Sequence, residues 1–469
     1  MGTRSRQIVS EVLEAAIAEM QTRLVPTLTD PDAQLVATMV SDLLNILAAW
    51  HQESPEALAA RMAPLAALCG SKDALDACSE DPGGLDAYEG LAGEIQRRIE
   101  HGGPADLDLL RAAVSADRAF YAGECDLSRR GASRGRERIA AVEVEMTADR
   151  AERLVKACLG EGFSLEHLAR LPGGMSKDSF FLALRTPRGA SMEVVVRRDL
   201  PFGPALTTVK DEYALLTRLI GRGLPIAAPL GCDTTGLVGQ PAMLSERVGG
   251  RSGPQPWQQD PAARKAVCLE LAEVMARLHR IDPSDVELEA AEDPHLQVQA
   301  YVQLWRERWR SNRREPSPTL AAAFDWLLAN LPREVDRVSL VHGDIGFHNI
   351  LVDGDSVRAL LDWEFFHPGD AAEDLSYVKQ FIEPLMPWPE FLAAYRAAGG
   401  GEYRAENAAF YEVWRDVRNS VTCATAWRGF LEGKYPALKM AYQGMSLFRY
   451  FPQRAASNLG EKIGCVFQT

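Results

Sequence analysis

The chain has 469 residues, of which 46% are hydrophobic and 25% are charged, and its formal net charge is −14. This length predicts two or three domains, and the composition is typical of a soluble globular protein. The acidic balance argues against nonspecific binding to nucleic acid, and no run of apolar residues is long enough to predict a membrane span. The first residues lack an apolar signal core, and the eight cysteines have no paired spacing, so we expect a cytoplasmic protein with reduced thiols.

The chain up to about residue 122 has a helical pattern throughout. Two early stretches repeat apolar side chains at helical spacing: Ile8, Val12, Leu13, Ala16 and Met20, and then Leu35, Met39, Leu43, Leu44 and Leu47. Leu107–Tyr121 predicts a further helix, so we expect a small helical bundle. These stripes predict packing rather than a ligand site, and such a module offers a surface for a partner or for self-association.

A linker and the start of a second part follow the bundle. Ser128–Arg138 is rich in Arg and Gly, which predicts a mobile, solvated linker. Thr147 is a suitable N-cap for a helix over Ala148–Leu159, and Gly160 is a suitable end for it.

A glycine turn between two strands comes next. Residues 171–180, LPGGMSKDSF, and the apolar run after them predict a strand, a turn at Gly173 and Gly174, and a returning strand. Glycine lets backbone N–H groups approach a phosphate closely, and the hydroxyl of Ser176 adds a further donor. An ordinary hairpin turn is the alternative interpretation.

Further strands and helices alternate after this turn. Met192–Val196 predicts a strand that ends at Arg197, and Thr208–Leu219 predicts an amphipathic helix. Ala242–Gly250 predicts an edge strand followed by a glycine break, and Leu271–Ile281 predicts part of a long helix.

Residues 301–314, YVQLWRERWRSNRR, combine aromatic and basic side chains. Trp305 and Trp309 lie one helical turn apart, and Arg306 and Arg310 belong to a cationic edge. Aromatic faces can cage a quaternary amine, whereas clustered arginines suit the phosphates of an anionic molecule. A packed helix with a solvated basic face is the alternative without a binding role.

Val341–Glu364, VHGDIGFHNILVDGDSVRALLDWE, contains the strongest chemical signal. Asp344 is followed five positions later by Asn349, and Asp362 follows an intervening apolar hairpin. Two short apolar segments around an Asp-Gly pair are a typical hairpin signal. Because a hairpin returns the chain on itself, we expect Asn349 and Asp362 to reach one metal ion.

These residue types suit phosphoryl transfer. A γ-phosphoryl group that leaves ATP carries charge, and Mg²⁺, which neutralises this charge, takes hard oxygen ligands. Asp362 and Asn349 supply such oxygens, while Asp344 can accept a hydrogen bond from an acceptor hydroxyl and aim it at phosphorus. The sequence therefore predicts transfer from ATP, with Mg²⁺, to a hydroxyl group.

His-Gly-Asp-x-x-x-x-Asn followed by Asp-Trp-Glu and by a Gly-Asp-x-x-x-Asp-Leu run resembles the catalytic core of the aminoglycoside phosphotransferase and choline kinase-like family. These are small-molecule kinases with a protein-kinase-like fold. The resemblance implies that Asp344 is the catalytic base and that Asn349 and Asp362 bind the metal. It also implies a structural role for His342 and a bracing role for Asp374 beneath the catalytic loop.

The same resemblance implies an ATP-binding lobe upstream, with the glycine turn over the phosphates. Arg197 stands where kinases place a phosphate-binding lysine, and family members associated with acyl-CoA metabolism often carry Arg there. Glu212 is the expected ion-pair partner of Arg197, and Lys210 is an alternative phosphate-binding cation. Backbone groups near Glu246 and Val248 are expected to bind adenine.

We therefore expect an α+β, bilobal protein-kinase-like fold, with a small β-rich N-lobe and a mostly helical C-lobe, preceded by an all-α helical bundle. The expected boundaries are 1–125 for the bundle, 126–146 for the linker, 147–250 for the N-lobe, and 251–469 for the C-lobe with a helical acceptor-binding insert.

The acceptor is the least determined feature. Arg197 and the Trp-Arg insert resemble the acyl-CoA-associated branch, in which some members phosphorylate hydroxyacyl-CoA thioesters. We expect a hydroxyacyl-CoA or another hydroxylated metabolite, and an aminoglycoside or an amino alcohol such as choline is the alternative. Glu364 and the Trp and Arg side chains named above in the insert are candidate acceptor-binding residues.

A protein without catalytic activity is the alternative of another class. A kinase-like fold that has lost activity could serve as a nucleotide-binding sensor or scaffold. The presence of Asp344, Asn349 and Asp362 together favours an active enzyme. A protein kinase is disfavoured because Gly343 replaces the Arg of the protein-kinase catalytic loop.

Overall fold

The computed structural model describes residues 28–29, 31–53, 55–70, 85–102, 107–131, 145–171, 174–253, 255–435 and 437–464. The first apolar stripe, from Ile8 to Met20, most of the expected linker and Gly173 therefore lie outside the described residues. The chain divides into two compact units. The first comprises Met1–Val142, Val302–Asn330 and Glu412–Thr469, and the second comprises Glu143–Tyr301 and Leu331–Tyr411.

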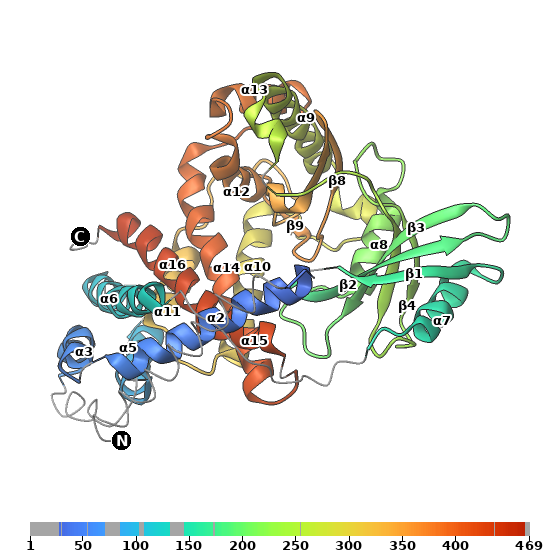
Figure 1. Ribbon diagram of the computed structural model, residues 1–469. Helices are drawn as coiled ribbons and strands as arrows, with labels where there is room; N and C mark the ends of the chain where they lie inside the picture. The colour runs from blue at the N-terminus through green and yellow to red at the C-terminus, as the bar shows by residue number, and fades with distance from the viewer. Residues whose placement is uncertain are drawn as a thin grey trace. The chain divides into compact units, whose positions relative to one another are not determined.

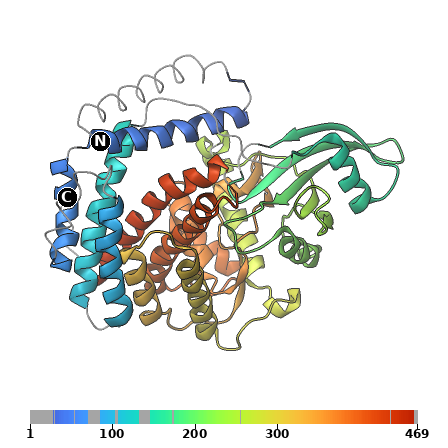
Figure 2. The ribbon, with the colours of Figure 1, turned by 90° about the horizontal axis from the view of Figure 1, so that it is seen from below.

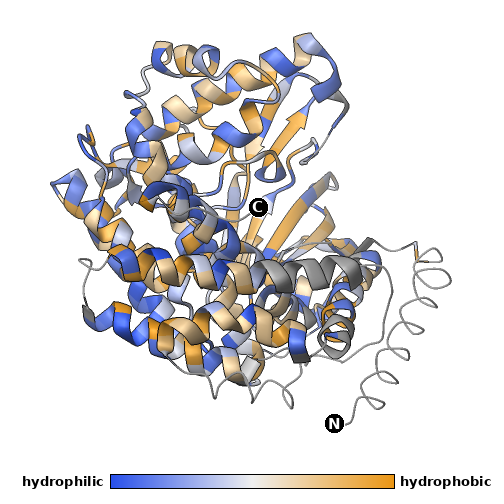
Figure 3. Cartoon of the chain, turned by 90° about the vertical axis from the view of Figure 1, so that its left-hand side faces the viewer, coloured by the Kyte–Doolittle hydropathy of each residue, from blue (hydrophilic) through white to orange (hydrophobic). Residues whose placement is uncertain are grey.

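The described residues of the first unit are mostly helical (Figures 1 and 2). Its elements are α2 (Pro31–Gln52), α3 (Pro55–Cys69), α5 (Leu85–Gly102), α6 (Leu107–Gly131), the C-terminal part of α10 (Pro294–Asn312), α11 (Pro318–Ala329), most of α14 (Ala405–Leu431), α15 (Leu438–Tyr442), the π-helical η8 (Gln443–Leu447) and α16 (Phe448–Ile463). Figure 3 shows polar and apolar residues interspersed along these helices, as amphipathic packing requires.

Buried polar contacts join the N-terminal helices to α11. Asp117 on α6 is fully buried and accepts hydrogen bonds from the Tyr88 hydroxyl at 2.6 Å and from the backbone N–H of Thr319 at 2.9 Å. The backbone N–H of Ser317 donates to Gln96 at 2.8 Å. The first N–H groups of a helix have no partner within it, so Asp117 and Gln96 satisfy the start of α11.

The compact units thus do not follow the boundaries expected from the sequence. Residues 302–330 and 412–469 fall in the same unit as the N-terminal helices, rather than with the rest of the expected C-lobe. The N-terminal helices were expected to form a small bundle over residues 1–125. In the structure they are grouped with helices from the far end of the chain.

The second unit begins with a helix on a five-stranded antiparallel sheet (Figure 1). The helix is α7 (Ala148–Leu159), and the strands β1 (Ser164–Arg170), β2 (Lys177–Arg185), β3 (Ser191–Asp199), β4 (Pro229–Asp233) and β5 (Ala242–Glu246) have the order β1-β2-β3-β5-β4. The Thr147 side chain caps α7 and Gly160 ends it with a φ of 94°, as predicted. Leu154 and Val155 of α7 belong to one apolar core with the strands.

Helix α8 (Val209–Leu219) lies between β3 and β4 in the chain. Thr208 and Asp211 form a capping box at its start, which satisfies two of its orphan N–H groups. Val209, Leu215 and Leu219 are buried, so one face of this helix packs inward and carries Glu212 with it.

The remaining part of the second unit combines helices with two short antiparallel sheets of two strands each. Its elements are η5 (Pro256–Gln259), α9 (Pro261–His279), η6 (Pro283–Val286), the first part of α10, β6 (Ser339–Val341), η7 (Phe347–Asn349), β7 (Ile350–Asp353), β8 (Ser356–Leu360), β9 (His367–Gly369), α12 (Ala372–Ile382) and α13 (Trp388–Ala397). Strand β6 pairs with β9, and β7 pairs with β8. The predicted Asp-Gly turn is present, with Gly354 at a φ of 62°.

The expected fold class is confirmed, since a small antiparallel sheet precedes a mostly helical part and an all-helical region comes first. Two further observations concern only the described residues. None of their helices has the length and apolar character needed to cross a membrane. Among the residues whose side chains are described, five cysteines are free thiols: Cys69, Cys158, Cys232, Cys268 and Cys423.

Candidate functional site

The catalytic loop starts at a turn that follows β6, and a buried carboxylate holds this turn. Gly343 has a φ of 85°, a conformation that glycine adopts without strain. Asp374, at the start of α12, accepts hydrogen bonds from the backbone N–H groups of His342 and Gly343, both at 2.8 Å. The bracing role expected for Asp374 therefore has a direct geometric basis.

Asp374 is itself held by a second histidine. Nε2 of His279, near the end of α9, lies 3.1 Å from Asp374, and Nδ1 lies 2.9 Å from the Tyr395 hydroxyl. Burial acts to raise the pKa of Asp374, but the hydrogen bond and charge of His279 and the backbone N–H of His342 outweigh it and lower this pKa. The ionised carboxylate of Asp374 thus binds His279 and the backbone of the turn.

His342 is a structural side chain. Its Nε2 donates to the backbone carbonyl of Leu361 at 3.0 Å, because a carbonyl can only accept. Its Nδ1 then accepts from the backbone N–H of Asp344 at 3.3 Å. Burial lowers the pKa of His342, which agrees with this neutral tautomer. The ring also packs on Trp363 at a centroid distance of 4.5 Å.

Leu361 brings the two parts of the signature together. Its backbone N–H donates to the carbonyl of Asn349 at 2.8 Å, while its own carbonyl accepts from His342. The residue before Asp362 is therefore fixed to Asn349 and to the catalytic turn. This is the close approach that the predicted hairpin between Asn349 and Asp362 required.

Asn349 is oriented by Asp344. Its Nδ2 donates to Asp344 Oδ2 at 2.7 Å and to the Asp344 carbonyl at 3.1 Å. Since the amide nitrogen faces Asp344, the side-chain oxygen of Asn349 points away from this carboxylate. An amide oxygen so directed is a neutral, hard ligand for a cation.

Asp362 has a backbone conformation that is uncommon for a residue with a side chain. Its φ is 62°, in the left-handed region, where strain is retained mainly at functional sites. Arg197 Nη2 binds Asp362 Oδ1 across 165 residues of chain. The carboxylate is one-third exposed, so it remains accessible to a ligand.

The donor set fits Mg²⁺ held partly by the protein. Within the described residues, no group of three or more His, Cys, Asp or Glu side chains could hold a metal ion. Mg²⁺ commonly takes one or two protein oxygens and completes its shell with water and substrate phosphates. One carboxylate from Asp362 and one amide oxygen from Asn349 match that pattern.

The glycine turn lies beside this site. Gly174 has a φ of 73°, and a Cβ on it would collide with the backbone oxygen of Lys177, so glycine is required here. The Ser176 hydroxyl donates to Glu364 Oε2. The other glycine of the predicted turn, Gly173, lies outside the described residues.

Two cations share one buried glutamate. Glu212 is 1% exposed and pairs with Lys177 Nζ at 2.7 Å and with Arg197 Nη1 at 3.7 Å. Burial acts to lower the pKa of Arg197, but Glu212, Asp362 and Glu364 outweigh it and raise this pKa. The expected Arg197–Glu212 ion pair is therefore present, whereas Lys210 on the same helix is exposed.

Glu364 lies beside the residues that follow the glycine turn. It is 7% exposed and contacts Ser176 and Lys177, and its backbone carbonyl accepts from the Thr207 hydroxyl at 2.8 Å. Burial and the charge of Asp362 raise the pKa of Glu364 to about 7. The sequence suggested Glu364 as an acceptor ligand, and in the structure its carboxylate contacts Ser176 and Lys177.

The segment after β5 is where the sequence predicts the adenine-binding hinge. Glu246 ends β5 and pairs with Ala228, and Arg251 forms a two-way backbone bridge with Val352. Val248 lies between these two anchors. Within the described ranges its backbone N–H and C=O have no partner in the protein, so they can bind a planar base.

The Trp-Arg insert has a different role from the one expected. Trp305 and Trp309 are 0% and 1% exposed, and their rings pack on Trp414 and Phe324 within the first unit. A cage for a quaternary amine must expose its ring faces, so this interpretation was wrong.

The arginines of the insert are occupied by carboxylates of the same unit. Arg306 binds Asp325 at 2.7 Å, and Arg310 binds Glu307 at 2.8 Å and lies 3.9 Å from Glu100. These ion pairs contradict the expectation of an arginine cluster reserved for an anionic ligand.

Two features of the site were missed in the sequence. Lys177 stood next to the glycine turn, but nothing in a single sequence indicates that a lysine on β2 will pair with a helix 35 positions later. The other is an aromatic cluster beside Asp344, which includes His348, Tyr377 and Phe381. The spacing of Tyr377 and Phe381, one helical turn apart, was its only sequence signal.

Asp344, Asn349 and Asp362 lie within the part of the chain that matches known proteins. The model of the phosphotransferase enzyme family matches residues 167–410, more than half of the chain. The chain is 26% identical over 238 residues to mouse acyl-CoA dehydrogenase family member 10, a match that covers 49% of this chain and 22% of that protein. It is 28% identical over 253 residues to chicken acyl-CoA dehydrogenase family member 11, covering 51% and 31%.

The chain thus spans only about a fifth to a third of the length of these relatives. Among solved structures, a protein classified as an aminoglycoside phosphotransferase from Ralstonia eutropha matches with a TM-score of 0.51 and 20% identity. This match covers 67% of the present chain and 98% of the other, and it shows the fold alone.

Proposed function

The chain belongs to the phosphotransferase enzyme family, and we propose that it transfers the γ-phosphoryl group of ATP, with Mg²⁺, to a hydroxyl of a small metabolite. The observation that carries this proposal is that hydrogen bonds link Asp344, Asn349 and the residue before Asp362. Asp344 binds Asn349, and Asn349 is joined through the backbone of Leu361 to Asp362.

Each of these residues has a task that its contacts allow. Asp344 accepts the hydrogen bond of the acceptor hydroxyl and takes its proton as the oxygen attacks phosphorus. Asn349 and Asp362 would hold Mg²⁺, which when bound neutralises charge on the phosphate oxygens. Arg197 adds a cation beside Asp362, and the glycine turn offers backbone donors.

The surface next to Asp344 supports an acceptor with an apolar or flat body. Nε2 of His348 lies 3.4 Å from Asp344, and its ring borders Tyr377 at 6.5 Å and Phe381 at 5.9 Å between centroids. Phe347 packs against Phe381, and Trp257 packs against Phe347. Both Phe347 and Trp257 are only 6% exposed, so they support the cluster from the protein interior.

Glycine permits this arrangement. A Cβ at Gly346 would lie 2.5 Å from His348 Cε1 and 2.9 Å from Phe381 Cε2. Without a side chain at position 346, both rings rest directly on the catalytic-loop backbone. His348, backed by the rings of Tyr377 and Phe381, thus borders Asp344, and this apolar surface favours an apolar acceptor over a polycation.

A hydroxyacyl-CoA thioester is the acceptor that best fits these features. Its hydroxyl is carried on an apolar chain, which suits the cluster of His348, Tyr377 and Phe381. The relatives named after acyl-CoA dehydrogenases are consistent with this class. An aminoglycoside or choline-like amino alcohol is the second candidate, supported by the fold shared with the Ralstonia protein.

The first test is release of ADP from MgATP with a panel of hydroxyacyl-CoA thioesters, choline and aminoglycosides, using Asp344→Asn as the blank. We expect stimulation by hydroxyacyl thioesters that the blank lacks. Phe381→Ala should raise the acceptor KM by about tenfold or more while leaving the KM for ATP unchanged, as loss of a buried ring contact implies.

Stimulation only by polycationic or quaternary-amine acceptors would select the second candidate and contradict the apolar one. MgATP binding without stimulation by any acceptor would instead indicate a nucleotide-binding scaffold.

A further inference from the structure

Lys177 is the most deeply buried cation of the site. It is the first residue of β2, next to the glycine turn, and its side chain is 2% exposed. Nζ lies 2.7 Å from Glu212 Oε1, 3.3 Å from the Thr207 carbonyl and 3.7 Å from Glu364 Oε2. Burial acts to lower the pKa of Lys177, but the two glutamates outweigh it and raise this pKa.

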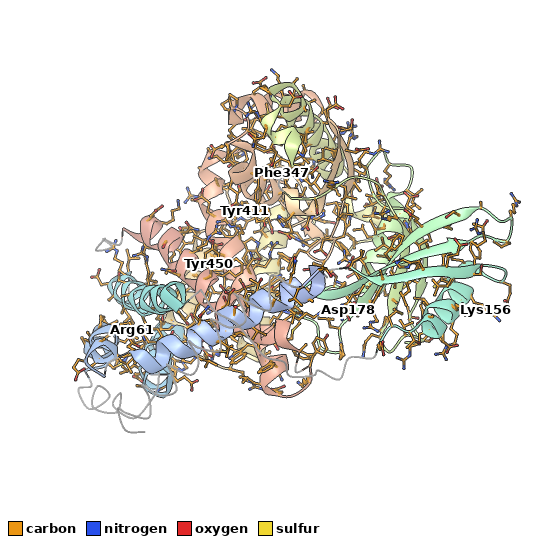
Figure 4. The ribbon with its side chains drawn as sticks, viewed as in Figure 1. Arg61, Lys156, Asp178, Phe347, Tyr411 and Tyr450 are labelled. Carbon is orange, nitrogen blue, oxygen red and sulfur yellow. The ribbon has the colours of Figure 1, made fainter. Side chains whose placement is uncertain are left out.

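Strand register places Lys177 and Arg197 on one face of the sheet. Ser179 is opposite Arg197, and Lys177 is opposite Asp199, so the side chains of alternate residues point the same way. Asp178, labelled in Figure 4, points to the other face, where it binds Arg198 at 2.8 Å. Two cations therefore converge on Glu212 from neighbouring strands.

The two cations differ in how they use Glu212. Lys177 makes the short contact and is enclosed, whereas Arg197 is 3.7 Å from Glu212, is 18% exposed and binds Asp362. In a protein kinase a single β3 lysine both pairs with the helix glutamate and binds the nucleotide phosphates. Here Lys177 on β2 makes the short contact with Glu212, while Arg197 on β3 is more exposed and binds Asp362.

We propose that Lys177 is a positioning residue, which fixes Glu212 so that Arg197 is directed toward Asp362 and the phosphates. This inference rests on the proposed function, because it assigns a task within the same nucleotide site. Within the described part of the chain, Lys177 is the only cation paired with Glu212 Oε1, so removal of Lys177 leaves a buried carboxylate for which Arg197 must compensate. Arg197 would then be drawn toward Glu212 and away from Asp362.

The test is a double-mutant cycle read out by equilibrium binding of MgADP, which needs no acceptor. The variants are Lys177→Met and Arg197→Met, each alone and combined with Glu212→Gln, together with Glu212→Gln alone and Lys177→Arg. Lys156→Met, an exposed lysine on α7 labelled in Figure 4, is the matched control. Thermal melting of every variant separates loss of binding from loss of folding.

We expect Lys177→Met to weaken MgADP binding by roughly tenfold or more, and Lys177→Arg to recover most of it. In the Glu212→Gln background, Lys177→Met should cost less than about threefold, because Lys177 acts through that carboxylate. Arg197→Met should weaken binding in both backgrounds, and Lys156→Met should change nothing.

Three results would overturn the inference. Equal loss from Lys177→Met in both backgrounds would mean that Lys177 touches the phosphates itself. No loss in either background would leave it without a role in nucleotide binding, and no MgADP binding by the wild-type chain would remove the site. Normal MgADP binding with no ADP release for any acceptor would contradict the proposed function while the cycle still decides the role of Lys177.

Discussion

Removal of the Asp374 carboxylate should loosen the catalytic turn by an amount that its contacts define. Asp374 is fully buried and accepts two backbone hydrogen bonds, from His342 and Gly343, at 2.8 Å each. A hydrogen bond to a charged group contributes about 1.5–3 kcal/mol, so Asp374→Ala should lower the free energy of opening this turn by about 3–6 kcal/mol. The His279 contact adds to this loss.

Amide hydrogen exchange measures this opening directly. A loss of about 3–6 kcal/mol corresponds to roughly 10²–10⁴-fold faster exchange for the amides of His342 and Gly343, if opening precedes exchange. Asp374→Asn keeps one accepting oxygen and should give an intermediate effect. Asp353→Ala, in the exposed hairpin turn, is the control and should leave these amides protected. Unchanged protection of the two amides in Asp374→Ala would refute the bracing role.

Three other substitutions test the remaining parts of the site. Asp344→Asn should reduce kcat by at least about a hundredfold in the ADP-release assay with little change in MgADP binding, and near-normal turnover would exclude Asp344 as the base. Asp362→Ala should abolish the Mg²⁺ dependence of ADP binding in calorimetry, and an unchanged dependence would place the metal elsewhere. Gly346→Ala should raise the acceptor KM by about tenfold, since its Cβ displaces the His348 ring, whereas equal rises in both substrate KM values would argue against a local effect.

The chemical part of the site could be predicted from the sequence because its signals are local. Asp344, Asn349 and Asp362 lie within one short stretch, and the Asp-Gly turn between them fixes how the chain returns. The cap at Thr147 and the left-handed end at Gly160 depend only on neighbouring residues, and both are as expected. The fold class follows from the same order of elements, which agrees with the family match over residues 167–410.

Other features depend on which faces meet, and the sequence did not contain that information. Arginine at position 197 looked like a substitute for one lysine, but Lys177 on the adjacent strand makes the shorter contact with Glu212. Trp305 and Trp309 had the spacing of a binding stripe and of a core stripe alike. Only their burial among helices distant in sequence distinguishes the two.

The sequence by itself therefore predicted phosphotransferase chemistry, because the residues expected to perform it lie on short loops and a hairpin. The tertiary structure decided which cations pair with Glu212, which aromatic rings surround His348 beside Asp344, and which helices form a compact unit with the N-terminal ones. Each of these depends on pairing between segments far apart in the chain, where periodicity shows that a face is apolar or charged but not what it packs against.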